Sequence, residues 1–250
     1  MVGRKTSLRI RKIHRYLGLF LGVQFIFWTL GGLYFSWSNM DEIHGDTYRN
    51  PSSYLNASDS LVSPSLVIQK ISEKVSVDSL KSVQLIEILE KPVYRIHYFS
   101  EGKVVAQLAD ASSGVLRSSL TKEEAVLMAQ QAFKPHNMVE SVEYLTATGK
   151  HHEYRARSLP AWAVTFEHPS RTTIYIAAEE GVIERFRNRN WRIFDFFWMM
   201  HTMDYEGRDH FGNWLLRAFS ILGFVTVFFG FLLWFVTSPT IRKAIKTKKP

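Results

Sequence analysis

Two long apolar stretches interrupt the alternation of hydrophobic and polar positions along the chain. No charged residue occurs in 16–40 or in 218–238. Each stretch exceeds the roughly 18–20 apolar residues that a helix needs to cross a hydrocarbon layer about 30 Å thick. The pattern therefore predicts transmembrane helices over 16–38 and 211–237. A buried core helix is the alternative for either stretch, and two such stretches in one small chain disfavour it.

The first stretch could also be the core of a cleaved signal peptide. It follows a basic segment, and Ser36-Trp37-Ser38 is a weak imitation of a small-x-small cleavage site. The apolar run is longer than the roughly 7–15 residues of a signal-peptide core, and it carries bulky aromatic residues to its end. We therefore interpret it as a retained anchor.

Between the two stretches, the pattern changes twice from helical to alternating. A polar segment at 41–60 is interpreted as a linker. The block 61–118 then begins with a helical pattern, and the block 119–188 begins with a capping-box signature after Thr121. Alternation and turn residues predict three main strands in each block. These strands are 82–89, 93–99, 103–109, 138–145, 161–166 and 172–177.

Matching landmarks indicate that the two blocks are an internal duplication. Pro92-Val93-Tyr94 corresponds to Pro160-Ala161-Trp162, and Gly114-Val115 corresponds to Gly181-Val182. Coincidental alternation is the alternative explanation. We expect an α+β fold class, with two tandem units between two transmembrane helices. Each unit would be an antiparallel sheet covered by one helix.

The net charge of +8 is distributed unevenly. Residues 1–15 hold six Lys or Arg and residues 238–250 hold five, with no acid in either segment. Such basic ends mark the cytoplasmic side of membrane helices. We therefore expect a bacterial inner-membrane (cytoplasmic-membrane) protein with the lipid bilayer as partner, both termini cytoplasmic and the middle domain periplasmic. No basic patch is left that would call for a nucleic acid.

The chain has no cysteine. This excludes disulfides, thiolate metal sites, cysteine-ligated iron–sulfur clusters and covalent haem attachment, so a redox cofactor would be held noncovalently by His or Met. No Gly-rich phosphate loop, GxSxG, HExxH or adjacent nucleophile–base pair occurs, and no hydrolytic chemistry is expected. The charges at 204–209 are interpreted as a solvated cluster, and His151-His152-Glu153 as a polar loop.

A basic and aromatic segment at 189–210 leads into the second apolar stretch. It interleaves arginines with Phe and Trp and continues to Met199, Met200 and His201. An interfacial helix, or an early start of the second membrane helix, explains this composition without a cofactor.

Several of these features resemble the PepSY-associated transmembrane family. The stretch IHRYLGLFLGVQFIFWTLGGLYF at 13–35 is similar to its opening helix, and the duplicated blocks resemble PepSY units. The sequence HTMDY at 201–205, with the apolar stretch after it, resembles the family's His motif and closing helix. Some members are inner-membrane reductases of ferric siderophores, with haem held between helices by histidines. Those reductases generally have more than two transmembrane helices, and soluble PepSY modules are associated with modulating peptidases.

The resemblance implies b-type haem and makes four histidines candidate ligands: His14, His201, His44 and His210. At 1.5 Å per residue, His14 and the outer histidines lie roughly 30 Å apart across the bilayer, so one haem cannot join them. His44 or His210 could pair with His201, whereas His14 needs its counterpart in a homodimer or another subunit. The alternative is that His14 and His201 are interfacial polar residues and that the other two are loop residues.

Two function classes follow from these residues. The leading expectation is a membrane oxidoreductase subunit that takes part in haem-linked electron transfer, such as ferric-siderophore or metal-chelate reduction, as a dimer or with a membrane or periplasmic partner protein. The alternative is a membrane-anchored binding or regulatory module that modulates a peptidase or transporter. Gly18 and Gly22, one and two turns after His14, would give clearance for a porphyrin face or simply pack helices.

Overall fold

The computed structural model describes residues 4–51, 54–56 and 59–239. The chain divides into two compact units, one from 39–192 and one from 1–38 with 193–250. The expected α+β class is confirmed at the level of two antiparallel sheets and two candidate membrane-spanning helices. The basic segment 240–250 lies outside the described residues.

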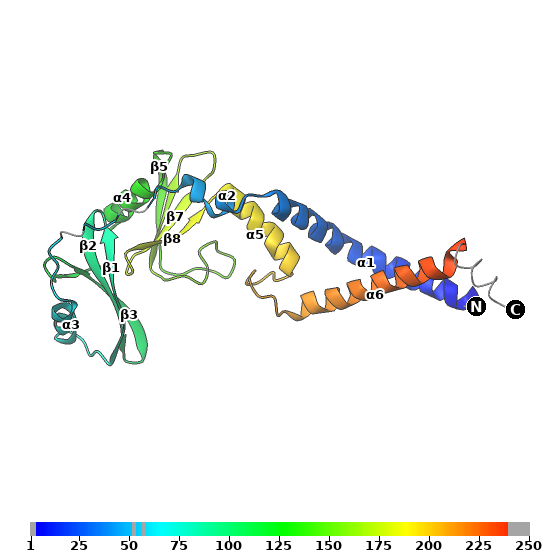
Figure 1. The fold of residues 1–250 in the computed structure, drawn as a ribbon, viewed down its shortest axis with the longest axis horizontal. Helices are drawn as coiled ribbons and strands as arrows, with labels where there is room; N and C mark the ends of the chain where they lie inside the picture. The colour runs from blue at the N-terminus through cyan, green and yellow to red at the C-terminus, as the bar shows by residue number, and fades with distance from the viewer. Residues whose placement is uncertain (1–3, 52–53, 57–58, 240–250) are drawn as a thin grey trace. The chain divides into compact units, whose positions relative to one another are not determined.

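The 39–192 unit holds two four-stranded antiparallel sheets, each with its strands in sequential order (Figure 1). Helices α3 (Pro64–Ser72) and α4 (Lys122–Ala132) precede the first and second sheet. One helix followed by four strands therefore occurs twice, as the sequence landmarks indicate. The strands are β1 (Ser79–Ile88), β2 (Lys91–Ser100), β3 (Lys103–Asp110), β4 (Leu116–Arg117), β5 (Val139–Leu145), β6 (Ala161–Phe166), β7 (Thr173–Ala177) and β8 (Val182–Arg187).

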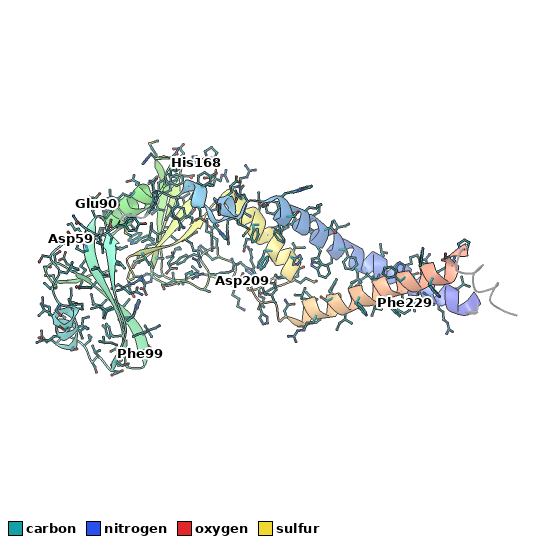
Figure 2. The ribbon with its side chains drawn as sticks, in the orientation of Figure 1. Asp59, Glu90, Phe99, His168, Asp209 and Phe229 are labelled. Atoms are coloured by element: carbon teal, nitrogen blue, oxygen red, sulfur yellow. The ribbon has the colours of Figure 1, made fainter. Side chains whose placement is uncertain are left out.

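Helix α3 covers one face of the first sheet. Its buried Val67 and Ile71 pack with alternate residues of β2, namely Tyr94, Ile96 and Tyr98. Because successive side chains of a strand point to opposite faces, Arg95 and His97 lie on the other face. Figure 2 labels Glu90, in the turn before this strand, and Phe99, near the strand's end.

Helix α4 begins at the capping box expected from the sequence. Thr121 Oγ1 accepts from the Glu124 amide at 3.2 Å, and the Glu124 carboxylate accepts from the Thr121 amide at 3.1 Å. Such reciprocal caps satisfy two amides that the helix leaves without partners. The buried core below α4 also includes Ile88 and Leu108 of the first sheet, so the two sheets share one core.

Gly181, in the β7–β8 turn, sets how closely the second sheet packs on the first. Its φ is +67°, and a Cβ at this position would lie 2.6 Å from Cδ1 of Ile88. We expect Gly181→Ala to destabilise the fold by about 2–4 kcal/mol, since it adds a core clash to the left-handed backbone cost.

Gly102 provides a matched control for this change. Its φ is +73°, but a Cβ there would meet open space. Gly102→Ala should therefore cost only the backbone strain, about 1–2 kcal/mol. The measurement is the urea midpoint of the full chain in detergent, followed by tryptophan fluorescence. Equal midpoint shifts for the two variants would contradict close packing at the β7–β8 turn.

In the other unit, α1 (Arg4–Trp37) and α6 (Trp214–Thr237) lie side by side (Figure 1). Both are long and apolar enough to cross a membrane, over 8–37 and 214–235. Only 17% and 11% of their most apolar windows are buried inside the structure. This exposure disfavours the core helix of a soluble protein, which would be covered on most sides.

The helix limits differ from those expected. Helix α1 continues through the basic N-terminal segment to Arg4, and α6 starts at 214 because the Asn213 side chain accepts from the Leu216 amide at 2.8 Å. Helix α5 (Arg189–Thr202) ends before α6 begins, so it is a separate helix and not an early start of the membrane helix.

The 41–60 segment is only partly a linker. It contains α2 (Met40–His44) and the 3-10 turn η1 (Asp46–Tyr48). The Asn50 side chain then donates to the Gln131 carbonyl at 2.7 Å, and its amide donates to the Ala132 carbonyl at 2.9 Å. The segment's first part is thus attached to the end of α4.

Candidate functional site

His14 is held against helix α6 by its ring. Its Nδ1 lies 3.1 Å from the Thr226 carbonyl oxygen. Because a carbonyl oxygen only accepts, Nδ1 carries the proton, and the neutral ring has its lone pair on Nε2. A methyl group at Gly230 would lie 3.1 Å from Cε1 of His14, so the glycine allows this approach. Metal-ligating histidines are commonly oriented by such a bond from the other ring nitrogen.

The surface beside His14 is open. A Cβ at Gly18 or at Gly22 would meet nothing within 4 Å, so neither glycine is packed against α6. Helix α6 carries a shallow apolar groove of about 450 Å³, lined by Val227, Gly230, Phe231 and Trp234. Of the two explanations for the α1 glycines, packing within one chain is therefore excluded among the described residues.

His201 lies in an aromatic contact between α5 and the second half of α1. Its ring centroid is 6.1 Å from Trp28 and 6.1 Å from Phe35. Trp28 Nε1 donates to the His201 carbonyl at 3.0 Å, and Gln24 Nε2 donates to the Met200 carbonyl at 2.7 Å. These bonds fix the backbone of α5, while the His201 side chain stays exposed.

Asp204 organises the loop after α5, whereas Glu206 and Asp209 are exposed, as expected for solvated charges. Asp204 is buried, and its carboxylate accepts from the amides of Glu206, Gly207 and His210. Burial alone would raise the pKa of Asp204, but these amides lower it more, and the net pKa lies below its ordinary value. Arg208 forms an ion pair with the buried Asp195.

His44 ends α2 in the 39–192 unit. The other three candidate histidines belong to the unit with α1 and α6, where His14 contacts α6 and His201 contacts Trp28 and Phe35. His210 is exposed in the loop before α6, and no ring contact joins it to His201 in the described ranges. Within the same ranges, no group of three His, Asp or Glu is placed to hold a metal ion.

A partly buried ionic cluster around Glu153 was not expected from the sequence. Arg192 binds both carboxylate oxygens, with Nε to Oε2 at 2.7 Å and Nη2 to Oε1 at 2.8 Å. The Tyr175 hydroxyl also donates to Oε1 at 2.8 Å, and Tyr154 stacks on the Tyr175 ring. His152 Nδ1 accepts from the Tyr154 amide, so His151-His152-Glu153 serves the loop and this cluster.

The two stacked tyrosines should resist ionisation. Burial raises the pKa of Tyr154 and of Tyr175, and the Glu153 charge raises that of Tyr175 further. Their folded pKa values lie above the unfolded value of about 10, so their contribution to stability is complete below pH 10 and lost as pH rises above it. A tyrosinate absorbance titration should show delayed groups, and Tyr175→Phe should remove one of them. Tyr54→Phe is the control, since Tyr54 is 94% exposed and its replacement should leave the delayed groups of Tyr154 and Tyr175 in place.

A second polar row lies on the first sheet, on the face away from α3. Ser82 Oγ is 3.0 Å from His97 Nδ1, and His97 Nε2 is 2.7 Å from Glu180 Oε2. Neither contact could be read from spacing, because strand register and the β7–β8 turn bring these residues together. The row is a nucleophile–base–carboxylate arrangement, which the sequence motifs had not indicated.

Comparisons with family models, curated proteins and solved structures give no match.

Proposed function

We propose that the chain is an inner-membrane electron-transfer protein that binds b-type haem, with His14 as a ligand that would hold its iron. The observation that carries the proposal is the His14 Nδ1 bond to the Thr226 carbonyl, because it leaves Nε2 as the ligating nitrogen. The open surface at Gly18 and Gly22 supports it, since a porphyrin face needs small residues beside the ligand.

The number of histidines supports a homodimer. Only His14, among the nine histidines, lies in α1 or α6. A b-type haem with two imidazole ligands at this level would therefore take His14 from each of two copies. When bound, the haem supplies one-electron transfer. The chain's own residues hold the imidazole tautomer and keep the site apolar through the α6 groove.

The resemblance to PepSY-associated membrane proteins extends the proposal to the electron acceptor, a ferric siderophore or another metal chelate. The tandem helix-and-sheet blocks support that resemblance, as does the placement of His201 between Trp28 and Phe35. His201 is retained as a second, outer haem candidate whose partner ligand would come from His210, from His44 or from a second copy.

A reduced-minus-oxidised absorption spectrum of the detergent-purified protein, expressed with ample haem, tests this function. We expect the sharp bands of a low-spin bis-imidazole haem, at a ratio of one haem for two chains. Absence of any haem band would reject the electron-transfer function and leave the membrane-anchored binding or regulatory module as the better account.

The proposed orientation has a separate test. The chain lacks cysteine, so single thiols can be introduced without background. A cysteine at Ser112, in the turn before β4, should react with a membrane-impermeant maleimide in intact spheroplasts. A cysteine at Thr247, which lies outside the described residues, should react only after lysis. The reverse labelling pattern would contradict cytoplasmic termini.

A further inference from the structure

Three side chains from separate segments form a continuous hydrogen-bonded row on the first sheet. Ser82 of β1 faces His97 of the neighbouring β2, and Glu180 arrives from the β7–β8 turn. Arg95, two positions before His97, lies 3.6 Å from the same Glu180 oxygen and forms an ion pair with the carboxylate. The His97 and Glu180 side chains retain 17% and 18% exposure, so solvent reaches the row.

The order of the contacts determines where the protons lie. A Glu180 carboxylate only accepts, so His97 Nε2 carries a proton, and in the neutral form of the ring Nδ1 is the acceptor. The Nδ1 lone pair then accepts the hydrogen of the Ser82 hydroxyl. A hydroxyl bonded to a base, with the base oriented by a third group, is the signature of an activated nucleophile.

We propose that Ser82 is a nucleophile that takes acyl groups from carboxylic esters, with His97 as its general base and Glu180 as the group that orients His97. Ser82 Oγ bonds to the ester carbon while its proton passes to Nδ1. The bond to the alcohol breaks, and the departing alcohol takes that proton. Water then attacks the acyl-serine and gives a proton to His97. The bond between the acyl carbon and Ser82 Oγ breaks, the carboxylic acid leaves, and the proton passes from His97 to Ser82 Oγ. An ester is the expected class because its alcohol leaves readily with only a nucleophile and a base.

The duplicated second sheet contains a natural comparison. Ser141 of β5 follows a register shift and pairs with Thr165 of β6, as Ser82 follows one and pairs with His97. Ser141 is the more exposed of the two serines, but a threonine stands where the first sheet has the base. Unselective labelling would therefore favour Ser141, and base-activated labelling would favour Ser82.

The test uses the full chain in detergent, a fluorophosphonate probe and p-nitrophenyl acetate, with the modified residue located by mass spectrometry. We expect modification at Ser82, its loss in Ser82→Ala and no change in Ser141→Ala. His97→Asn should slow labelling by about 100-fold or more, the usual scale of a general base. Glu180→Gln should slow it less, because it keeps an acceptor for Nε2.

Rescue by added imidazole distinguishes a general-base role of His97 from a structural role. In His97→Ala, added imidazole should restore part of the acylation rate, whereas a merely structural histidine would not be replaced in this way. Glu180→Gln provides a second folded variant if His97→Ala unfolds. Equal labelling of Ser82 and Ser141, or a rate unaffected by His97→Asn, would overturn the proposal. Either result would leave the haem function untouched, because no step here involves His14.

Discussion

Replacing Glu153 by alanine is expected to destabilise the 39–192 unit by about 2–4 kcal/mol, because it leaves the buried Tyr175 hydroxyl without its acceptor and removes both carboxylate bonds of Arg192. The Glu153 side chain is 19% exposed, and Arg192 binds it through two nitrogens. The Tyr175 hydroxyl, which also donates to Glu153, is buried. Removal of one partner from such a pair costs more than the pair itself contributes.

The measurement is the change in the urea midpoint of the full chain, followed by near-ultraviolet circular dichroism. Glu153→Gln should lower the urea midpoint less, since the amide oxygen of glutamine still accepts one hydrogen bond. Asp46→Ala is the matched control: its pair with Arg49 joins side chains that are 48% and 45% exposed, and such pairs contribute little. Equal midpoint shifts for Glu153→Ala and Asp46→Ala would contradict a large contribution of the Glu153 cluster to stability.

Loss of the Glu153 cluster should also destabilise the segments that lead to α1 and α5. Arg192 belongs to the first turn of α5, and Arg187 stacks over Trp191 at 3.8 Å. The Asn188 side chain accepts from the Trp191 amide at 2.7 Å and donates to the Glu42 carbonyl of α2 at 2.7 Å. The contacts of Arg192, Arg187 and Asn188 therefore attach α2 and the first turn of α5 to the second sheet.

The spacing of apolar residues along the chain predicts most elements of the fold. Local composition is sufficient for the two long helices, the capping box at Thr121 and the repeated order of helix and strands, because each depends on residues near in sequence. Helix α6 starts at 214 and not at the expected 211, because its start depends on a single side-chain contact, the Asn213 cap. The pattern of hydrophobic residues does not predict such polar contacts.

The polar sites were harder to predict because they are assembled over long sequence separations. Glu153 meets Arg192 across 39 positions, and His97 meets Glu180 across 83. Asp204 looked like one charge among several, and only the loop geometry turns three amides toward it. The His14 environment was foreseen in part: the sequence indicated nearby glycines, but not that Gly230 of α6 would face the ring.

His14→Ala is expected to abolish haem binding at the level of His14 and so to lower the haem content of the purified protein. Removal of a group that only orients a metal ligand typically lowers affinity about 10–100-fold, so removal of the ligand should lower it further. His136→Ala is the control, because His136 is an exposed histidine outside the helices. The measurement is haem content per chain, by pyridine haemochrome, at equal protein yield.

Gly230→Leu should have a similar effect without touching the ligand. Even a Cβ at this position would lie 3.1 Å from Cε1 of His14, and a leucine must displace the ring from the Thr226 carbonyl. A full haem content in this variant would mean that the observed ring position is not the one that binds haem.

Gly22→Leu and Gly32→Leu distinguish a shared haem from a site within one chain. A Cβ at either glycine meets nothing within 4 Å, so both variants should leave a single chain equally stable. Only Gly22 lies two turns from His14, on the surface where a porphyrin and a second copy would come together. Haem content and the dimer fraction in detergent should therefore fall together in Gly22→Leu and stay unchanged in Gly32→Leu. If Gly22→Leu loses haem but remains dimeric, Gly22 contacts the porphyrin and not the second copy. Unchanged haem and dimer content in both variants would contradict a haem shared through this surface.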